Sequence, residues 1–164
     1  MKRSAIAVSV LGTLTACATF EEPIPKGYAG PTVEVADTAS TQSPRLVHMF
    51  ELRAVDERRV RSSGIATVSA NQGQGLSQKA VVVKHRVPAA AVKVTLGAST
   101  LWAAPILAMT NPTCRVEGQV DFKPEAGRSY VVNGRITPEA CAAWIEDAET
   151  KKPVTAEVSG KGTK

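Results

Sequence analysis

Few side chains in this sequence could carry out chemistry on a metal ion. The only histidines are His48 and His85, and each falls on the apolar side of an alternating segment. Two histidines with a carboxylate can bind zinc, and such a site would make the protein a metal-binding protein or a small enzyme. No HxH or HExxH spacing supports that site. We therefore expect no metal and no cofactor, and the His48–His85 site stands as an alternative.

Nucleophilic catalysis lacks a recognisable sequence signature. It requires a serine or cysteine beside a base and an oxyanion donor, yet the chain contains neither GxSxG nor SxxK. The glycines at 73 and 75 are not followed by the Lys-Ser/Thr of a phosphate-binding loop. Any two carboxylates could still converge as in a glycosidase, but an aromatic content of 4% argues against a sugar-binding cleft. The sequence predicts a protein that is not an enzyme.

The N-terminus has the pattern of an export signal. Lys2 and Arg3 precede an apolar stretch over residues 5–14. About ten residues make a helix of roughly 15 Å, whereas a bilayer core requires about twenty residues. A positive start, a short apolar stretch and small residues before a boundary predict a signal peptide at residues 1–16.

The boundary carries a second motif. Leu14-Thr15-Ala16-Cys17 resembles the lipobox of bacterial lipoproteins. The resemblance implies lipid on the Cys17 thiol, cleavage after Ala16 and acylation of the new amino group; a second chain matters because one acyl chain binds membranes only marginally. Residue 18 is Ala rather than Asp, which by the same resemblance favours the outer membrane, facing the periplasm or the cell surface. The alternative is an ordinary cleaved signal followed by an unmodified cysteine.

Assigning Cys17 to lipid leaves Cys114 and Cys141 as an even pair. Exported proteins meet an oxidising compartment, where such a pair predicts a disulfide bond. Cys114 begins one arm of a predicted hairpin, and Cys141 follows the returning arm, so both fall at one end of the sheet. The bond would close a loop of about 28 residues and stabilise the fold by roughly 3 to 4 kcal/mol. A redox-active pair would have CxxC spacing, which is absent.

The charge balance gives little reason to expect a nucleic-acid partner. Without the signal peptide, 18 basic residues face 15 acidic ones, and the two signs are interleaved along the chain. Nucleic-acid surfaces require a basic stripe, commonly with stacking aromatic residues.

Alternation with period two dominates the chain and predicts a mainly β fold. It is clearest over residues 114–122 and 130–136, with a Pro- and Gly-containing turn between them. Further strands are expected at residues 45–55, 60–68, 80–87 and 92–96. The number and spacing of strands predict a small antiparallel β-sandwich, immunoglobulin-like or transthyretin-like.

Around this domain at residues 33–158, composition predicts two flexible ends. Residues 17–32 contain three prolines and two glycines and are expected to form a lipidated tether, which could span at most about 50 Å. Residues 159–164 are small, polar and basic and are expected to form a disordered tail.

Two segments remain open. Residues 138–148 fit a short helix or a strand, and the hairpin-like sequence that follows favours the strand. Residues 101–109 carry no charge, and Pro105 excludes a central strand or an undisturbed helix. This segment is either a buried edge or an exposed apolar loop that docks on a partner or a membrane. The side chains expected to make that contact are Leu101, Trp102, Ile106 and Leu107.

These inferences predict a lipid-anchored module of the cell envelope with a binding or structural role and an envelope protein as partner. An accessory subunit of an outer-membrane assembly or secretion complex is a more specific form of the same hypothesis.

Overall fold

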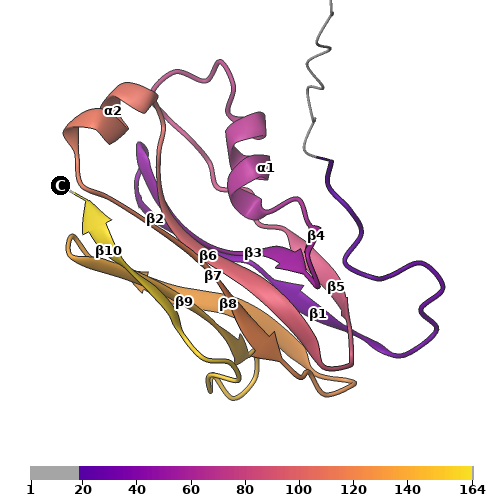
Figure 1. The fold of residues 1–164 in the computed structure, drawn as a ribbon. Helices are drawn as coiled ribbons and strands as arrows, with labels where there is room; N and C mark the ends of the chain where they lie inside the picture. The colour runs from indigo at the N-terminus through magenta and orange to yellow at the C-terminus, as the bar shows by residue number, and fades with distance from the viewer. Residues whose placement is uncertain (1–18, 164) are drawn as a thin grey trace, which may run out of the picture.

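Strands make up about half of residues 19–163, the part of the chain that the computed structural model describes (Figure 1). The elements are, in chain order, β1 Thr32–Ala36, β2 Thr38–Ser43, β3 Leu46–Val55, β4 Arg58–Arg59, α1 Ser63–Ala70, β5 Lys84–Pro88, β6 Val92–Trp102, α2 Pro105–Thr110, β7 Thr113–Phe122, β8 Ser129–Ile136, β9 Ala140–Asp147 and β10 Val158–Thr163. No helix in this part of the chain is long and apolar enough to cross a membrane.

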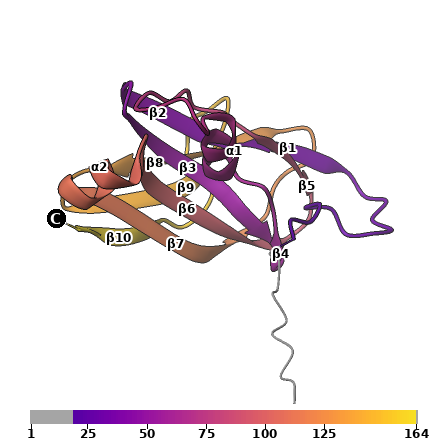
Figure 2. The same ribbon diagram turned by 90° about the horizontal axis from the view of Figure 1, so that it is seen from above.

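The strands form one mixed sheet that curls into a half-barrel (Figures 1 and 2). Its order is β2-β3-β6-β7-β10-β9-β8-β1-β5, with β4 paired to β3. The pairs are antiparallel except β1 with β8, which is parallel. The prediction of a mainly β fold is confirmed, while the finer assignment to an immunoglobulin-like or transthyretin-like sandwich stays a prediction.

A bend at Asp37 curls the sheet. β1 pairs with β5 and β8, whereas β2, which begins one residue after Asp37, pairs with β3. The hydroxyl of Thr38 donates to the carbonyl of Val132 across the bend, with an O···O distance of 2.6 Å. One continuous stretch of chain therefore contacts both halves of the sheet.

The inner face of the curled sheet holds the core, because alternate residues of each strand point to one side. Phe122 and Tyr130 meet edge to face there, with ring centroids 5.1 Å apart. The aliphatic members of the core that are fully buried include Val35, Leu52, Val94, Leu96, Val132 and Ile145. Burial of this apolar surface is the main force that holds the half-barrel together.

α1 occupies a region that the alternation pattern assigns to a strand. Ile65 and Val68 are three residues apart, a spacing that also fits one side of a helix. In the structure Ala66 and Thr67 face inward and Ile65 and Val68 face outward. The predicted strand at 80–87 is also shorter, because β5 begins only at Lys84.

The two open segments are resolved. Residues 140–147 are strand β9, so the short-helix alternative for 138–148 does not occur. Residues 105–110 form helix α2 with Pro105 in its first turn. At that position a backbone N–H would have no partner within the helix, so the N–H that proline lacks costs no hydrogen bond. Pro105 therefore starts a helix rather than disturbing one.

Both predicted flexible ends are more ordered than composition indicates. The expected tail forms β10, which inserts between β9 and β7; Gly160 and Gly162 allow this, because a Cβ at Gly162 would overlap the carbonyl of Pro138. At the other end, the N–H of Glu21 donates to Arg59 O at 2.7 Å, and the buried Pro23 accepts from Arg58 through its carbonyl. Cys17 and the signal peptide lie outside the described residues.

Candidate functional site

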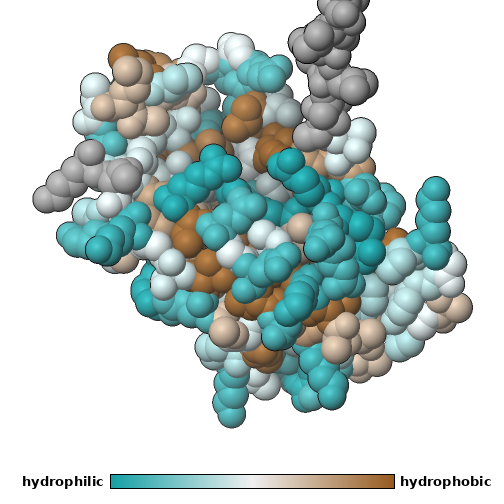
Figure 3. Space-filling model, viewed as in Figure 1, coloured by the Kyte–Doolittle hydropathy of each residue, from teal (hydrophilic) through white to brown (hydrophobic). Residues whose placement is uncertain are grey.

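A groove of about 730 Å³ runs along the outer face of β3, β6 and β7, beside α1. Its floor is charged, and its rim is apolar. The size lies within the range of small-ligand and peptide-binding pockets. Figure 3 shows hydrophilic atoms across the surface below the two helices.

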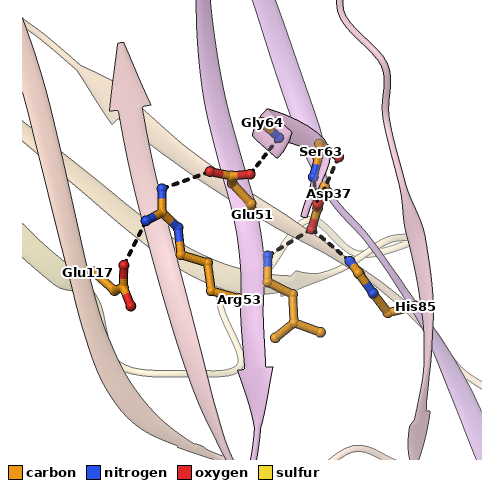
Figure 4. A network of polar contacts seen from close by, with 8 residues as sticks. Asp37, Glu51, Arg53, Ser63, Gly64, His85 and Glu117 are labelled. Carbon is orange, nitrogen blue, oxygen red and sulfur yellow. Dashed lines mark hydrogen bonds and ion pairs between the residues drawn. The ribbon is translucent and has the colours of Figure 1, made fainter. Parts of the chain in front are cut away.

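Arg53 organises the floor by joining two strands (Figure 4). Its guanidinium contacts Glu51 at 2.8 Å on the same strand and Glu117 at 2.6 Å on β7. To reach Glu117 it crosses β6 over Gly97, where a Cβ would overlap the guanidinium. Glu51 is 2% exposed, and its second oxygen accepts from the N–H of Gly64 at 2.6 Å. The floor charges are thus paired with one another and tied to the start of α1.

A second buried carboxylate fixes α1 on the sheet (Figure 4). Asp37 accepts from the N–H of Leu52 at 2.8 Å and from the N–H and hydroxyl of Ser63 at 2.9 and 2.7 Å. The Nε2 atom of His85 lies 3.6 Å from the same carboxylate. The hydroxyl of Ser63 in turn accepts from the N–H of Val83 at 2.7 Å. This cluster supports the wall of the groove from below and is itself closed to solvent.

The apolar rim comes from α1 and from the segment that precedes the domain. Ile65, Val68 and Phe20 are 37%, 50% and 43% exposed and line the groove together. Leu101 lines its other end. Hydroxyl groups such as those of Ser99 also line it, but no histidine does, and its cysteine is Cys114 of the disulfide pair. The arrangement is suited to binding a molecule that has both apolar and charged groups.

α2 is the second exposed feature. None of its residues is buried, and Ile106 and Met109 are 60% and 80% exposed. Trp102 and Leu107 are half-buried beside them. Segment 101–109 is therefore not a buried edge: Leu101 belongs to the groove, while Ile106 and Leu107 belong to the exposed helix. A contact with a partner through these residues stays a prediction.

Cys114 and Cys141 lie at disulfide distance, as the sequence predicts. Their sulfur atoms are 2.08 Å apart and their Cα atoms 5.9 Å apart. Both are buried, on β7 and β9 at either side of β10. The pair connects the two strands that β10 separates.

The two histidines occupy separate environments. His48 lies on β3, opposite Ser40 and Thr100, and burial lowers the pKa of its imidazole. His85 is buried on β5 beside Asp37. Across residues 19–163 no three His, Cys, Asp or Glu side chains gather in the way a metal ion requires.

Asp147, at the turn after β9 and away from the groove, is a carboxylate with several hydrogen-bond donors. The backbone N–H of Thr150, with the guanidinium of Arg128 and the N–H of Glu149, lowers the pKa of Asp147 to about 2. The contacts to the Asp147 carboxylate are 2.8, 2.9 and 3.0 Å respectively. This carboxylate has structural partners and no opening toward the groove.

Sequence reasoning missed Asp37, Glu51 and Arg53. Glu51 and Arg53 lie in β3 and Asp37 lies between β1 and β2, where a single charge gives no local signal. The partners of Asp37 and Glu51 on α1 are 26 and 13 residues away along the chain. The one available signal was the pair of carboxylates in or next to strand segments, with Glu51 inside β3 and Asp37 directly after β1.

Compared with known proteins, the chain matches no family model, no curated protein and no solved structure. Function is therefore inferred from the groove, α2 and the N-terminal sequence.

Proposed function

We propose that the protein is a lipoprotein of the bacterial outer membrane that acts as a non-enzymatic binding module. The export pattern at residues 1–16 and the lipobox ending at Cys17 support the anchor. The buried Cys114–Cys141 pair fits a protein that passes through an oxidising compartment. The sandwich of immunoglobulin or transthyretin type remains part of this proposal.

The groove is the observation that carries the binding role. It is a concave site in which Glu51, Arg53 and Glu117 are already paired with one another. Catalysis would need a nucleophile beside a free base, and no histidine lines the groove. A concave site whose charges are already paired is better suited to binding a ligand than to proton transfer.

The proposed ligand is a polypeptide segment of another envelope protein. Arg115, Glu117 and Gln119 point outward at alternate positions of β7 and offer both signs of charge. Ile65 and Val68 provide an apolar wall opposite them. A segment with apolar residues along one side and charges of both signs along the other matches this surface. If the partner belongs to a larger outer-membrane assembly, the protein is an accessory subunit of that assembly.

The alternative based on His48 and His85 has less support. His85 faces Asp37 beneath α1 and has no open path to the groove. Measurement of zinc and copper in the purified protein checks this alternative directly. A stoichiometric metal that disappears when both histidines are replaced by alanine would restore it.

Two experiments test the proposal. Metabolic labelling with a palmitate analogue should mark the wild-type chain and not Cys17→Ala. A photo-crosslinking amino acid at Val68 should join the protein to one envelope protein in intact cells, and Glu117→Lys should abolish that crosslink by reversing a groove charge. Val154 is comparably exposed, at 43%, and lies beyond β9, so the same probe there is the control. Equal crosslinking from both positions, or none from either, would refute binding in the groove.

A further inference from the structure

Within residues 33–158, the three longest stretches without Asp, Glu, Lys or Arg are residues 38–44, 62–78 and 94–114. Charged residues make up 21% of the whole sequence, so stretches of 17 and 21 uncharged residues stand out. They contain β2, α1 with the loop after it, and most of β6 followed by α2. The third stretch begins in the core with Val94, Leu96 and Ala98, and its exposed part is the segment around α2.

The fold brings the three stretches together at one side of the molecule. Gln78, at the end of the loop after α1, donates from its side chain to the carbonyl of Leu101 at 2.7 Å. Its backbone N–H donates to the carbonyl of Pro44 at 2.9 Å. Figures 1 and 2 show α2, this loop and the start of β3 at the same end, with α1 on the same side of the sheet. Segments that are far apart in sequence thus form one uncharged face.

Most of the large apolar side chains that the fold leaves exposed lie on this face. Ile106 and Met109 project from α2, Val68 from α1, and Leu76 from the loop, where it is 48% exposed. In Figure 3 hydrophobic atoms appear over α2 and again over α1. Exposed apolar side chains from separate elements on one face mark an interaction surface rather than scattered exposure.

The chain leaves the domain on the same side. Phe20 lines the groove together with Ile65 and Val68, and the next residue, Glu21, is fixed to Arg59 by its backbone N–H. Cys17 is only three residues before Phe20. Three residues span at most about 11 Å. A lipid on Cys17 would therefore hold α1 close to the bilayer, without the long tether that composition indicates.

The border of the uncharged face is basic. Arg45 follows the first stretch, Arg61 and Lys79 flank the second, and Arg115 follows the third. All four are exposed. The acidic neighbour of the first stretch is Asp37, which is buried and bonded to Ser63 and Leu52. A neutral apolar face bordered by Lys and Arg is complementary to a bilayer that contains anionic lipid.

We infer that the face formed by α2, α1 and the loop at 71–78 lies on the lipid bilayer that holds the Cys17 lipid. Ile106, Met109 and Leu76 enter the headgroup region, and the basic border contacts anionic headgroups. The inference rests on the proposed lipidation of Cys17 and adds an orientation to it. In this orientation the groove opens beside the membrane surface, where a segment of another envelope protein would approach.

The chain carries its own pair of probes for this orientation. Trp102 lies at the end of β6, directly before α2, whereas Trp144 lies on β9 and contacts Arg135 and Glu146. Both are half-buried, so they are matched emitters. Trp144→Phe leaves Trp102 as the reporter, and Trp102→Phe leaves Trp144.

The experiment places the full lipidated protein in vesicles of phosphatidylethanolamine and phosphatidylglycerol, with and without bromine on the acyl chains. Interfacial side chains reach about 5 to 10 Å into the boundary between headgroups and acyl chains. We expect brominated lipid to reduce Trp102 emission by a factor of about two and to leave Trp144 emission unchanged. Ile106→Ser with Met109→Ser should restore Trp102 emission in brominated vesicles.

Mass spectrometry of the Cys17 peptide separates the two ways in which the inference could fail. An acylated chain whose Trp102 is as bright in brominated vesicles as in unbrominated ones overturns the orientation and leaves the lipoprotein proposal intact. A chain without acyl groups overturns both. If Trp102 is not quenched and a photo-crosslinker at Met109 joins the chain to a protein in intact cells, α2 faces a protein and the membrane contact is refuted.

Discussion

The two helices of this protein are alike in composition and opposite in how the sheet holds them. Both are short and free of charge, and both lie on the outer side of the half-barrel. α1 begins on two buried carboxylates, Asp37 and Glu51, which accept from its first N–H groups. α2 begins at Pro105 and buries none of its residues.

This difference shows that intrinsic helix propensity contributes little to holding either helix in place. Isolated helices of six to eight residues are marginal in water. Anchoring by Asp37 and Glu51 makes α1 a rigid wall of the groove. α2 has no such anchor: it buries none of its residues, and its terminal hydrogen bonds are local, such as Asn111 to Leu107. The side chains of Ile106 and Met109 are exposed and available to another surface.

The most direct way to break this contrast is to remove the anchor of α1. Asp37→Ala leaves the buried N–H of Leu52 and the N–H of Ser63 without acceptors. We expect the free energy of unfolding to fall by about 3 to 5 kcal/mol, measured by denaturant titration. Asp121→Ala removes an exposed carboxylate and is the control. A loss below about 1 kcal/mol would mean that Asp37 does not hold α1.

The half of the sheet without helices depends on a covalent link instead. Cys114→Ser with Cys141→Ser should lower the free energy of unfolding by roughly 3 to 4 kcal/mol, because the unfolded chain regains the entropy of a loop of about 28 residues. A reducing agent should destabilise the wild-type protein by the same amount and leave the double variant unchanged. If the reductant destabilises both proteins equally, its effect does not come from this pair.

The second anchor of α1 can be tested with a conservative change. Glu51→Gln weakens the contact with Gly64 and leaves the partly buried Arg53 with one carboxylate. We expect a loss of about 1 to 3 kcal/mol in thermal or denaturant unfolding. Glu117 contacts the same guanidinium but is 49% exposed, so Glu117→Gln should change stability by less than about 1 kcal/mol. Equal losses for the two variants would contradict the importance of burial.

Substitutions in α2, by contrast, should leave the free energy of unfolding almost unchanged. Because Ile106 and Met109 are exposed, Ile106→Ser with Met109→Ser should alter the free energy of unfolding by no more than about 0.5 kcal/mol. Leu96→Ala in the adjacent strand β6 removes a fully buried side chain and should cost about 2 to 5 kcal/mol. A large loss from the α2 variant would show that the helix is part of the core.

The last prediction concerns pH. The pKa of Asp147 is lowered from 3.8 to about 2, so its stabilising contribution is complete above pH 3.8 and is lost as pH falls toward 2. Wild type and Asp147→Asn should therefore differ most in unfolding free energy near neutral pH and converge near pH 2. A constant difference from pH 7 to pH 2 would show that the Asp147 charge is not responsible.

Features that depend on local pattern were predictable from the sequence. The strands at 113–122 and 129–136 were found because alternation marks each of them and a Pro–Gly turn separates them. The expectation that they pair as a hairpin was wrong, because β10 and β9 lie between β7 and β8 in the sheet. The cysteine pair was predicted from that hairpin and is confirmed, but it connects β7 and β9 across β10. The strand at 140–147 was favoured over a helix by the turn after it.

Features that depend on residues far away in the sequence were not predictable. Ser63 becomes a helix start because Asp37 lies across the sheet from it, and no local signal marks that relation. β10 has two glycines and a basic composition typical of a tail, yet it pairs with β7 on one side and β9 on the other, a position that exists only once the sheet has formed. The groove could not be predicted, because Arg53 and Glu117 meet only across β6.

The places of the first and last strands also have a mechanical consequence. β1 lies between β5 and β8, and β10 lies between β7 and β9, so neither terminal strand is at an edge of the sheet. A pull on the N-terminal segment would act along β1, across hydrogen bonds that run perpendicular or slanted to the strand. Those bonds would have to shear together rather than open one after another, so the domain should resist extraction force better than a sheet whose first strand lies at an edge.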